Sequence, residues 1–321
     1  MLVLSEHDVN RALPISDCID ALEQMFIGLA RGEFFQPLRV RANPGTGPNW
    51  MTLMPSARLA APRLWALKQM VVTPTNTQNG LDPIQGVVLL HDGDDGRLLA
   101  VVNAPALTAI RTAAVSALAT RLLARADSAR VAIIGAGVQA KAHVAAMKHL
   151  YPKASFRIWS RNRNNAVSLA DESGATVADT ITAAAQGADI LCTVTASATP
   201  VISRAMVAPG CHINAVGSSA ANAREIDART VADASLFVDR RESTLSESGD
   251  YLGALAEGAI SGPEHIQAEL ADILLGNHHG RSSSSEITLF KSLGLAIEDL
   301  IAAELAVQSA AKLGIGTRCP W

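Results

Sequence analysis

The sequence feature that most constrains the fold is a glycine-rich turn between an apolar strand and a helix. The apolar run RVAII at 130–134 leads directly into GAGVQA at 135–140, and a helical stretch follows at once. In a G-x-G-x-x-A turn the first glycine permits a tight turn, the second lets the backbone approach a pyrophosphate, and the small last residue allows close helix–strand packing. The helix N-terminus then receives the phosphates. The residues expected to form this dinucleotide-binding turn are Gly135, Gly137, Val138 and Gln139.

The turn opens a region in which β-prone and helical stretches alternate as far as Asp239. Such alternation specifies a parallel sheet with helices on both faces. Before it, residues 37–102 hold short β-prone runs separated by turn-rich pieces, which predicts an antiparallel meander. Residues 105–126 are rich in Ala and Leu without Gly, so they predict one long helix leaving that sheet. Because 321 residues exceed the usual size of one core, we expect two domains, a Rossmann-type doubly wound α/β domain and an α+β domain.

The end of the second strand of the alternating region indicates which dinucleotide is bound. An acidic residue there would bind the free 2′-hydroxyl of an adenosine ribose. The strand FRIW is followed instead by Ser160, Arg161 and Arg163, and hydroxyl and guanidinium groups suit a 2′-phosphate. We therefore expect NADP(H) as the preferred cofactor, with NAD(H) as the alternative. A loop whose arginines are only solvated is the competing interpretation.

Cations stand in apolar or β-prone settings at three places in the first part of the chain. Arg39 and Arg41 lie two residues apart on a β-prone run and so share a face. Lys68 sits within LWALKQMVV, and Arg111 interrupts the long apolar helix. Buried cations are costly unless an anion meets them, and for each residue alone an ion pair with Asp or Glu explains the pattern as well as a ligand does. Together they predict a clamp for a carboxylate.

Charge and hydropathy exclude other classes of partner. The chain has 27 Lys and Arg against 30 Asp and Glu, so it offers no basic footprint for a nucleic acid or an anionic membrane. Glu6 and Asp8 precede any apolar stretch of signal-peptide length, and we find no run of about 18 apolar residues, so we expect a cytoplasmic protein. The adjacent His278 and His279 are expected to point in different directions, and no metal centre is predicted.

Six stretches of the chain resemble one known family, the ornithine cyclodeaminase and mu-crystallin family. They are MPS at 54–56, LKQMVVTPTNTQNGL at 67–81, LTAIRTAAVSALA at 107–119, IIGAGVQAKAH at 133–143, PGCHINAVGSSAANAREID at 209–227 and TLFKSLGLAIEDL at 288–300. The resemblance implies a homodimer whose first domain forms the subunit contact and most of the substrate pocket, with the C-terminal helix returning to it. It thus implies a discontinuous substrate-binding and dimerisation domain at 1–119 plus 290–321, and a Rossmann domain at 120–289.

The resemblance also assigns roles to single residues. Lys68 and Arg111 match the family's carboxylate-binding lysine and arginine. Arg39 matches a third cation better than Arg41, because it follows a proline at similar spacing. The residues implied to contact the cofactor are Thr112, Thr195, Ala196, Val216 and Gly217, together with the loop that carries Lys291 and Ser292.

Two departures from cyclodeaminases favour one chemistry within the family. Ser219 stands where cyclodeaminases have an aspartate, and Thr52 stands where they have a glutamate. The aspartate can direct protons during ammonia loss, whereas a serine hydroxyl is a poor substitute without an adjacent base. Mu-crystallin-like ketimine reductases resemble this chain in having a serine there.

We therefore expect an NAD(P)H-dependent reductase of a small cyclic imine 2-carboxylate, such as pyrroline-2-carboxylate or piperideine-2-carboxylate. Lys68, Arg111 and Ser219 are the expected catalytic residues. Arg39 and Thr52 are expected to contact the substrate with Lys68 and Arg111. The alternatives are an ornithine cyclodeaminase-type lyase or a hydroxyproline dehydratase, and a nucleotide-binding, crystallin-like protein without catalysis.

Four acidic residues near these motifs are given no catalytic role. Glu225 and Asp227 fit a helix N-terminus, where carboxylates are favourable. Glu298 and Asp299 are neighbours in a helix, where successive side chains diverge by about 100°. We therefore expect the second pair to make interdomain or solvent contacts.

Overall fold

The computed structural model describes residues 1–320 and divides the chain into two compact units. One unit combines Met1–Arg111 with the segment from Leu295 onward, and the other is Thr112–Gly294. The boundaries expected at 119/120 and 289/290 thus fall at 111/112 and 294/295. The first of them lies inside α3 (Ala104–Leu123), the long helix predicted over 105–126.

Helix α3 is long and apolar enough, by length and composition, to cross a membrane. It is not an unbroken apolar run, because Arg111 and Arg121 lie within it. Because 78% of its 18-residue apolar window is buried inside the protein, α3 is a core helix.

The first unit is built on a mixed eight-stranded sheet with the order β16-β1-β7-β6-β5-β4-β2, in which β3 also pairs with β4. Neighbouring strands from β7 to β2 are antiparallel, as the meander predicts, whereas β1 pairs with β7 in parallel. The strands are β1 (Leu2–Leu4), β2 (Phe34–Phe35), β3 (Val40–Ala42), β4 (Trp50–Arg58), β5 (Leu64–Val72), β6 (Ile84–Asp92), β7 (Leu98–Asn103) and β16 (Thr317–Arg318). The helices are α1 (Glu6–Ala12), α2 (Ile15–Ala30), the 3-10 helix η1 (Pro74–Asn79) and α11 (Ala296–Leu313).

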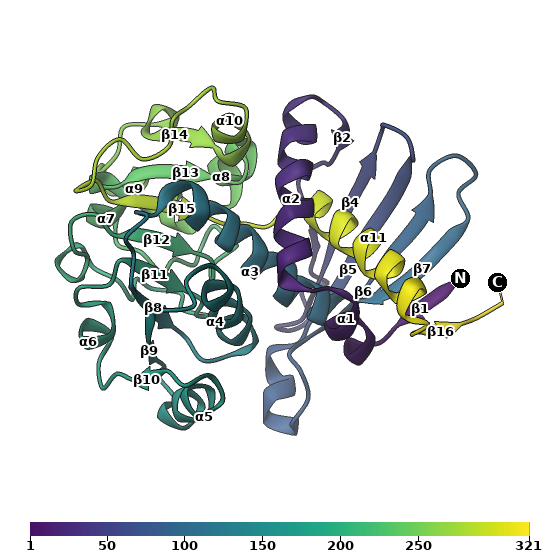
Figure 1. Cartoon of the computed structure of the whole chain (residues 1–321), viewed down its shortest axis with the longest axis horizontal. Helices are drawn as coiled ribbons and strands as arrows, with labels where there is room; N and C mark the ends of the chain where they lie inside the picture. The colour runs from purple at the N-terminus through teal and green to yellow at the C-terminus, as the bar shows by residue number, and fades with distance from the viewer. Residues whose placement is uncertain (321) are drawn as a thin grey trace. The chain divides into compact units, whose positions relative to one another are not determined.

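Helix α11 covers one face of this sheet, packing on β4, β5 and β6 and against α2 (Figure 1). Side chains alternate between the two faces along a strand. The buried residues Thr52 and Met54 of β4 and Lys68 of β5 share a face, with Met54 directly opposite Lys68. Ser56 lies on the same face and donates a hydrogen bond from its Oγ to the Ala296 carbonyl at 3.1 Å. The face that carries Lys68 is therefore the face that α11 covers.

The second unit is an all-parallel, doubly wound sheet with the order β10-β9-β8-β11-β12-β15-β13-β14, which runs from bottom to top in Figure 1. Its strands are β8 (Arg130–Ile134), β9 (Ser155–Trp159), β10 (Thr176–Val177), β11 (Ile190–Thr193), β12 (His212–Ala215), β13 (Ser235–Val238), β14 (Ile266–Glu269) and β15 (Thr288–Lys291). Its helices are α4 (Val138–Leu150), α5 (Arg163–Ser173), α6 (Ile181–Ala185), α7 (Ala228–Asp233), α8 (Arg241–Glu247), α9 (Gly249–Ala256) and α10 (Leu270–Leu274), with the 3-10 helices η2 (Arg204–Met206) and η3 (Pro263–His265).

The strand order of this unit fixes where a ligand belongs. The chain winds outward from β8 through β9 to β10 on one side, and through β11 to β12 on the other. Ligands of such sheets bind beyond the carboxyl ends of the strands where the order reverses, here between β8 and β11. Strands β14 and β15 lie outside the predicted alternation, and β15 is inserted between β12 and β13.

Candidate active site

A buried ion-pair cluster occupies the covered face of the sheet in the first unit. The Lys68 Nζ lies 2.6 Å from Asp299 Oδ2. The Arg111 Nε donates to Asp299 Oδ1 at 2.9 Å, and its Nη1 donates to Glu298 Oε2 at 2.7 Å. Each of the four side chains is at most 5% exposed. Asp299 therefore joins a cation from β5 to a cation from α3.

This cluster overturns the expectation for Glu298 and Asp299. They lie in the first turn of α11 and are buried, rather than facing solvent or another domain. Their side chains do diverge, but the forked guanidinium of Arg111 reaches both. The apolar residues on both sides of this acidic pair, in GLAIEDLIAA, are the sequence signal that could have predicted its burial.

Arg39 and Thr52 lie near the same cluster. Arg39 directly precedes β3, is half-buried, and its charge acts on Lys68. Arg41, the less favoured choice, is exposed on β3 opposite Thr52. Thr52 is buried on β4, two residues from Met54, the partner of Lys68. The first unit thus brings together Arg39, Lys68, Arg111 and Thr52.

The charges of this cluster act on the protonation of Lys68. Arg39, Lys68 and Arg111 supply three positive charges, and Glu298 and Asp299 supply two negative ones. Burial lowers the pKa of the Lys68 ammonium from 10.5 to about 8. Asp299 opposes that shift, whereas Arg111 and Arg39 add to it. A ligand carboxylate close to Lys68 would favour the charged form of its ammonium.

The glycine-rich turn of the second unit has the form that a dinucleotide requires. Gly135 follows β8 with φ +129°, and a Cβ there would lie 2.8 Å from the Val194 carbonyl oxygen. Gly137 is the N-cap of α4, and a Cβ there would meet no atom within 4 Å. Val138 and Gln139 begin the helix, and Ala140 is fully buried against the strand layer. The turn therefore presents open backbone at a helix N-terminus, which suits a pyrophosphate.

The segment after β9 carries the residues expected to select the nucleotide. Arg161 and Arg163 are exposed and Ser160 is half-buried. The Arg163 Nη1 pairs with Asp179 Oδ1 at 2.7 Å, and both side chains are more than half exposed. An exposed pair of this kind is worth about 0–1 kcal/mol, so a 2′-phosphate can displace the Asp179 carboxylate at little cost.

The remaining expected cofactor contacts lie at the carboxyl ends of strands or in α3. Thr195 and Ala196 follow β11, and Val216 and Gly217 follow β12. Ser219 is half-buried in the same segment after β12, and Thr112 is buried in α3. Lys291 is buried with its Nζ 2.8 Å from Asp250 Oδ2, and it donates to the Ser218 carbonyl.

The two acidic residues after β12 have different roles. Asp227 is the N-cap of α7 and accepts a hydrogen bond from Thr230 N, so the capping prediction is confirmed for it. Glu225 does not cap a helix. Its buried carboxylate accepts from Thr193, Thr195 and Gly217, so the capping prediction is wrong for this residue.

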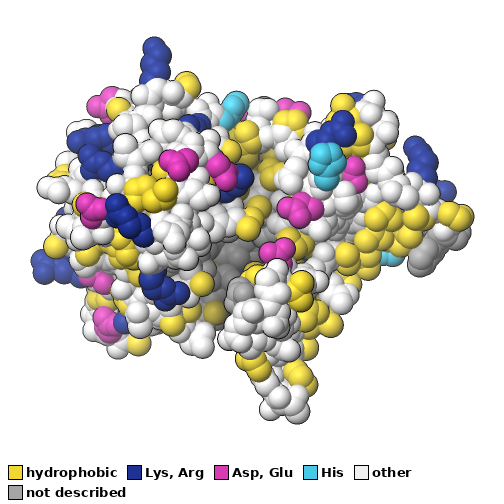
Figure 2. Space-filling model, turned by 90° about the horizontal axis from the view of Figure 1, so that it is seen from below, with side chains coloured by type: hydrophobic (Ala, Val, Ile, Leu, Met, Phe, Trp, Pro, Cys, Tyr) yellow, Lys and Arg dark blue, Asp and Glu magenta, His cyan; other side chains and the backbone are white. Residues whose placement is uncertain are grey.

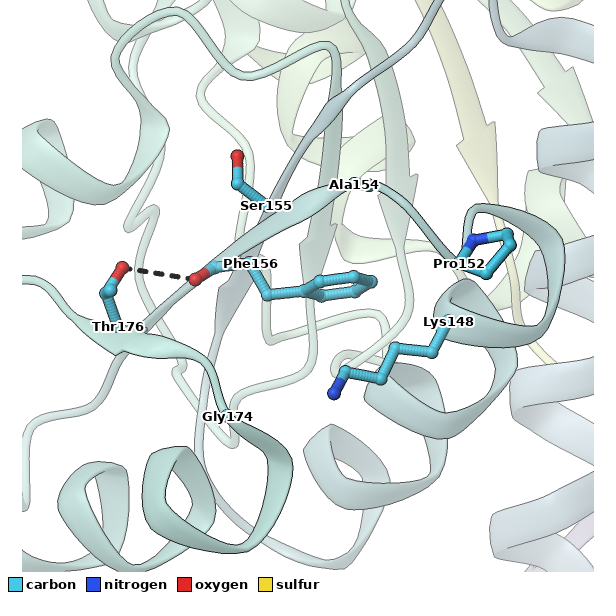
Figure 3. A pocket seen from close by; sticks show the side chains of 7 residues that line it. All are labelled: Lys148, Pro152, Ala154, Ser155, Phe156, Gly174 and Thr176. Atoms are coloured by element: carbon cyan, nitrogen blue, oxygen red, sulfur yellow. Dashed lines mark hydrogen bonds between the residues drawn. The ribbon is translucent and has the colours of Figure 1, made fainter.

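A cavity of about 420 Å³ lies at the other end of the second sheet. It is lined around the start of β9, where Thr176 Oγ1 donates to the Phe156 carbonyl (Figure 3). Lys148 lies 5.7 Å from the Phe156 ring centroid and donates to the Ser173 carbonyl. Because ligands of parallel sheets bind at the carboxyl ends of the strands, this cavity is not the nucleotide site.

The neighbouring histidines differ from expectation. His278 and His279 lie in the segment after α10 with their rings stacked, 4.8 Å apart between centroids, so the prediction that they diverge is wrong. Within residues 1–320, no group of three or more His, Cys, Asp or Glu could hold a metal ion.

Comparison with known proteins gives matches along the whole chain. The model of a family described as the ornithine cyclodeaminase/mu-crystallin family matches residues 1–313. Ketimine reductase mu-crystallin from Mus musculus is 37% identical over 280 residues, which cover 87% of this chain and 86% of that protein.

Two solved structures match both units. The Delta(1)-pyrroline-2-carboxylate reductase of Thermococcus litoralis, in complex with NADH and L-proline, has a TM-score of 0.94 and 36% identity, covering 99% of this chain and 100% of that one. An archaeal alanine dehydrogenase dimer with bound NAD has a TM-score of 0.92 and 26% identity, covering 100% and 99%. The resemblance deduced from the six motifs is thus confirmed.

Proposed function

Because this chain belongs to the ornithine cyclodeaminase/mu-crystallin family, we propose that it reduces a small cyclic imine 2-carboxylate to a cyclic amino acid with NAD(P)H. The observation that carries the proposal is the buried cluster in which Lys68 and Arg111 meet Asp299 and Glu298, with the charge of Arg39 acting on Lys68. A structure 36% identical to this chain contains L-proline, a cyclic amino acid with a 2-carboxylate, together with NADH. Pyrroline-2-carboxylate and piperideine-2-carboxylate are the proposed substrates.

In the proposed reaction, Arg39, Lys68 and Arg111 hold the substrate carboxylate and so fix the adjacent C=N carbon. Charged hydrogen bonds of this kind contribute about 1.5–3 kcal/mol each. The nicotinamide, when bound, supplies the hydride that the C=N carbon accepts. The ring nitrogen gains a proton, and the Lys68 ammonium is an acid of suitable pKa for that transfer. Ser219 is proposed to hold a water molecule near the same nitrogen.

The proposed cofactor is NADP(H), with NAD(H) as the alternative. The turn of Gly135 and Gly137 would hold the pyrophosphate, and Arg161 and Arg163 would hold the 2′-phosphate. The two solved relatives contain NADH and NAD, so the order of preference depends on the residues after β9 in this chain.

The function is tested by mixing the purified protein with NADPH or NADH and a panel of cyclic imine 2-carboxylates, and following nucleotide absorbance. We expect rapid NADPH oxidation with one member and slower oxidation of NADH. L-ornithine or hydroxyproline with NAD⁺ is run in parallel with ammonia detection. Ammonia without net nucleotide change would replace the proposal with a lyase. Nucleotide binding without turnover of any compound would replace it with a non-catalytic binding protein.

The pH profile of the reaction is expected to follow the deprotonation of the Lys68 ammonium. Because the pKa of Lys68 is about 8, kcat/KM for the imine should fall above about pH 8, by about tenfold per unit. Replacing Asp299 by Asn removes the charge that opposes this shift, so the fall should begin at lower pH. Glu304→Gln is the matched control, because Glu304 lies on the same helix and pairs with Arg58. An unchanged profile in D299N would exclude Lys68 as the titrating group.

Loss of folding does not explain the expected fall. The pKa of Lys68 is lower in the folded state than in the unfolded state, where it is near 10.5. Between pH 8 and 10.5 the unfolded chain therefore binds more protons at this site. Lys68 alone makes the free energy of unfolding rise with pH in that window, and circular dichroism at each pH checks this.

We further propose that the chain is a homodimer formed through the first unit. One face of its sheet packs against α11, whereas the opposite face carries apolar side chains on neighbouring strands. They include Met51, Leu53, Trp65, Leu67, Val71 and Leu89. Figure 2 shows hydrophobic side chains gathered in a band on this unit. Exposed apolar patches of this kind mark association sites, and the related alanine dehydrogenase structure is a dimer.

Charge on this face is expected to dissociate the dimer. The double substitution Trp65→Glu and Val71→Glu places two carboxylates on the outward face of β5, where the side chains are 47% and 37% exposed. Light scattering should give twice the mass of one chain for the unsubstituted protein and the mass of one chain for the variant. Val167→Glu, at a site 39% exposed in the second unit, should remain a dimer. A dimeric double variant would place the subunit contact elsewhere.

A further inference from the structure

Glu225 makes an unusual set of contacts at the carboxyl ends of two neighbouring strands. Its Oε1 accepts hydrogen bonds from Thr195 N at 2.6 Å and Thr195 Oγ1 at 2.7 Å. Its Oε2 accepts from Thr193 Oγ1 at 2.9 Å and Gly217 N at 2.7 Å. Glu225 is fully buried. One carboxylate thus ties the end of β11 to the segment that follows β12.

The two segments joined by this tie approach each other closely. A Cβ on Gly217 would lie 2.1 Å from the Thr195 carbonyl oxygen and 2.7 Å from Glu225 Oε1. The residue before Thr195 is Val194, whose carbonyl oxygen would lie 2.8 Å from a Cβ on Gly135 of the glycine-rich turn. The carboxylate is therefore connected through packed backbone to the turn that would hold the pyrophosphate.

Further charged groups hold Glu225 in place. Asp250 Oδ1 accepts from the backbone N–H groups of Glu225 and Ile226 at 2.8 and 2.9 Å. Lys291 Nζ lies 2.8 Å from Asp250 Oδ2 and donates to the Ser218 carbonyl at 2.6 Å. Burial raises the pKa of the Glu225 carboxyl, and the hydrogen bonds from Thr195 and the charge of Lys291 oppose that shift. An ionised carboxylate accepts all four hydrogen bonds, because it has acceptors only.

We propose that Glu225 is a positioning residue for the nicotinamide dinucleotide, acting through the backbone of Thr195 and Gly217. Both residues lie where ligands of doubly wound sheets bind. The carboxylate holds them in the conformation that receives the nucleotide before the nucleotide arrives. This inference rests on the proposed function only in so far as a nicotinamide dinucleotide is the ligand of this unit.

The substitution Glu225→Gln tests the proposal at nearly constant shape. The amide has one acceptor oxygen, and its NH₂ group must face either Thr195 N or Gly217 N, so one backbone tie is lost. We expect the Kd and KM for NADPH to rise about tenfold, while the KM for the imine carboxylate changes less than about twofold. NADPH fluorescence measures the Kd without any substrate.

Asp227→Ala is the matched control, because Asp227 lies two residues away and caps α7. It should lower the melting temperature without changing the Kd for NADPH. If E225Q does not fold, Thr193→Val removes only the hydroxyl contact to Oε2 and should raise the Kd about threefold.

The outcomes separate this inference from the proposed function. An E225Q protein with a lower melting temperature and an unchanged Kd for NADPH would overturn it, because Glu225 would then be only structural. Equal rises in Kd for E225Q and D227A, or an equal rise in the KM for the imine, would overturn it as well. If the unsubstituted protein bound neither NADPH nor NADH, the proposed function would fail first and the inference with it.

Discussion

Replacing Arg111 by lysine is expected to lower kcat/KM for the imine carboxylate by about 100-fold while leaving the Kd for NADPH unchanged. The Arg111 guanidinium contacts Asp299 and Glu298 with two of its nitrogens. Its planar fork can serve several acceptors at once, whereas an ammonium is a point charge with a different reach. A lysine that remains paired with the two carboxylates cannot also hold the substrate in the same geometry.

Arg58→Lys is the matched control for this variant. Arg58 Nη1 and Nη2 contact Glu304 at 2.6 and 2.9 Å, so it also joins the rest of the unit to α11 by a forked pair. R58K should lower the melting temperature by about as much as R111K does, and it should leave kcat/KM for the imine carboxylate unchanged. If kcat/KM of R111K stayed within about threefold of that of the unsubstituted protein, Arg111 would not bind the substrate and would serve only as an ion-pair partner of α11. Arg111→Ala is less informative, because removing one partner of a buried pair costs about 3–5 kcal/mol of stability.

Replacing Gly137 by alanine is expected to raise the Kd for NADPH at least about 30-fold without a change in melting temperature beyond about 2 °C. Gly137 has φ −93°, which alanine adopts readily, and its Cβ would meet no protein atom within 4 Å. The space that the methyl group enters is the space into which a pyrophosphate would come.

Two further glycines make this test specific. Gly47 also has no atom within 4 Å of an added Cβ, so Gly47→Ala in the first unit should change neither stability nor the Kd. Gly135 has φ +129° and a close carbonyl neighbour, so Gly135→Ala should unfold the turn and lower the melting temperature. A Kd in G137A within about twofold of the unsubstituted protein would show that the pyrophosphate binds elsewhere.

Local sequence was sufficient where the physical cause is local. The run RVAII followed by GAGVQA predicts a strand, a turn and a helix, because glycine φ/ψ freedom and apolar patterning act over a few residues. Asp227 was recognised as a cap because it bonds to an N–H only three residues on. The meander was predicted for the same reason, since each hairpin is closed by its own turn. The parallel pairing of β1 with β7 was not, because about a hundred residues separate the paired strands.

Contacts between distant segments account for the errors at the site. The apolar neighbours of Lys68 and Arg111 predict that both cations are buried. The sequence does not decide whether their partner is a ligand or an acidic residue of the chain. In the structure this partner is Asp299, which is 188 residues from Arg111 in the sequence. Glu225 was taken for a capping residue because it fits a helix N-terminus, where carboxylates are favourable. Its donors Thr193 and Thr195 lie about thirty residues earlier in the chain.

The sequence by itself therefore determined the family, the two-domain α/β organisation and the positions at which cations and glycines are needed. Only the tertiary structure decided which carboxylates neutralise those cations and which one ties β11 to the segment after β12. The physical reason is that a buried charge requires a partner, which the sequence can indicate, whereas the partner's identity depends on how chain segments far apart in sequence are packed.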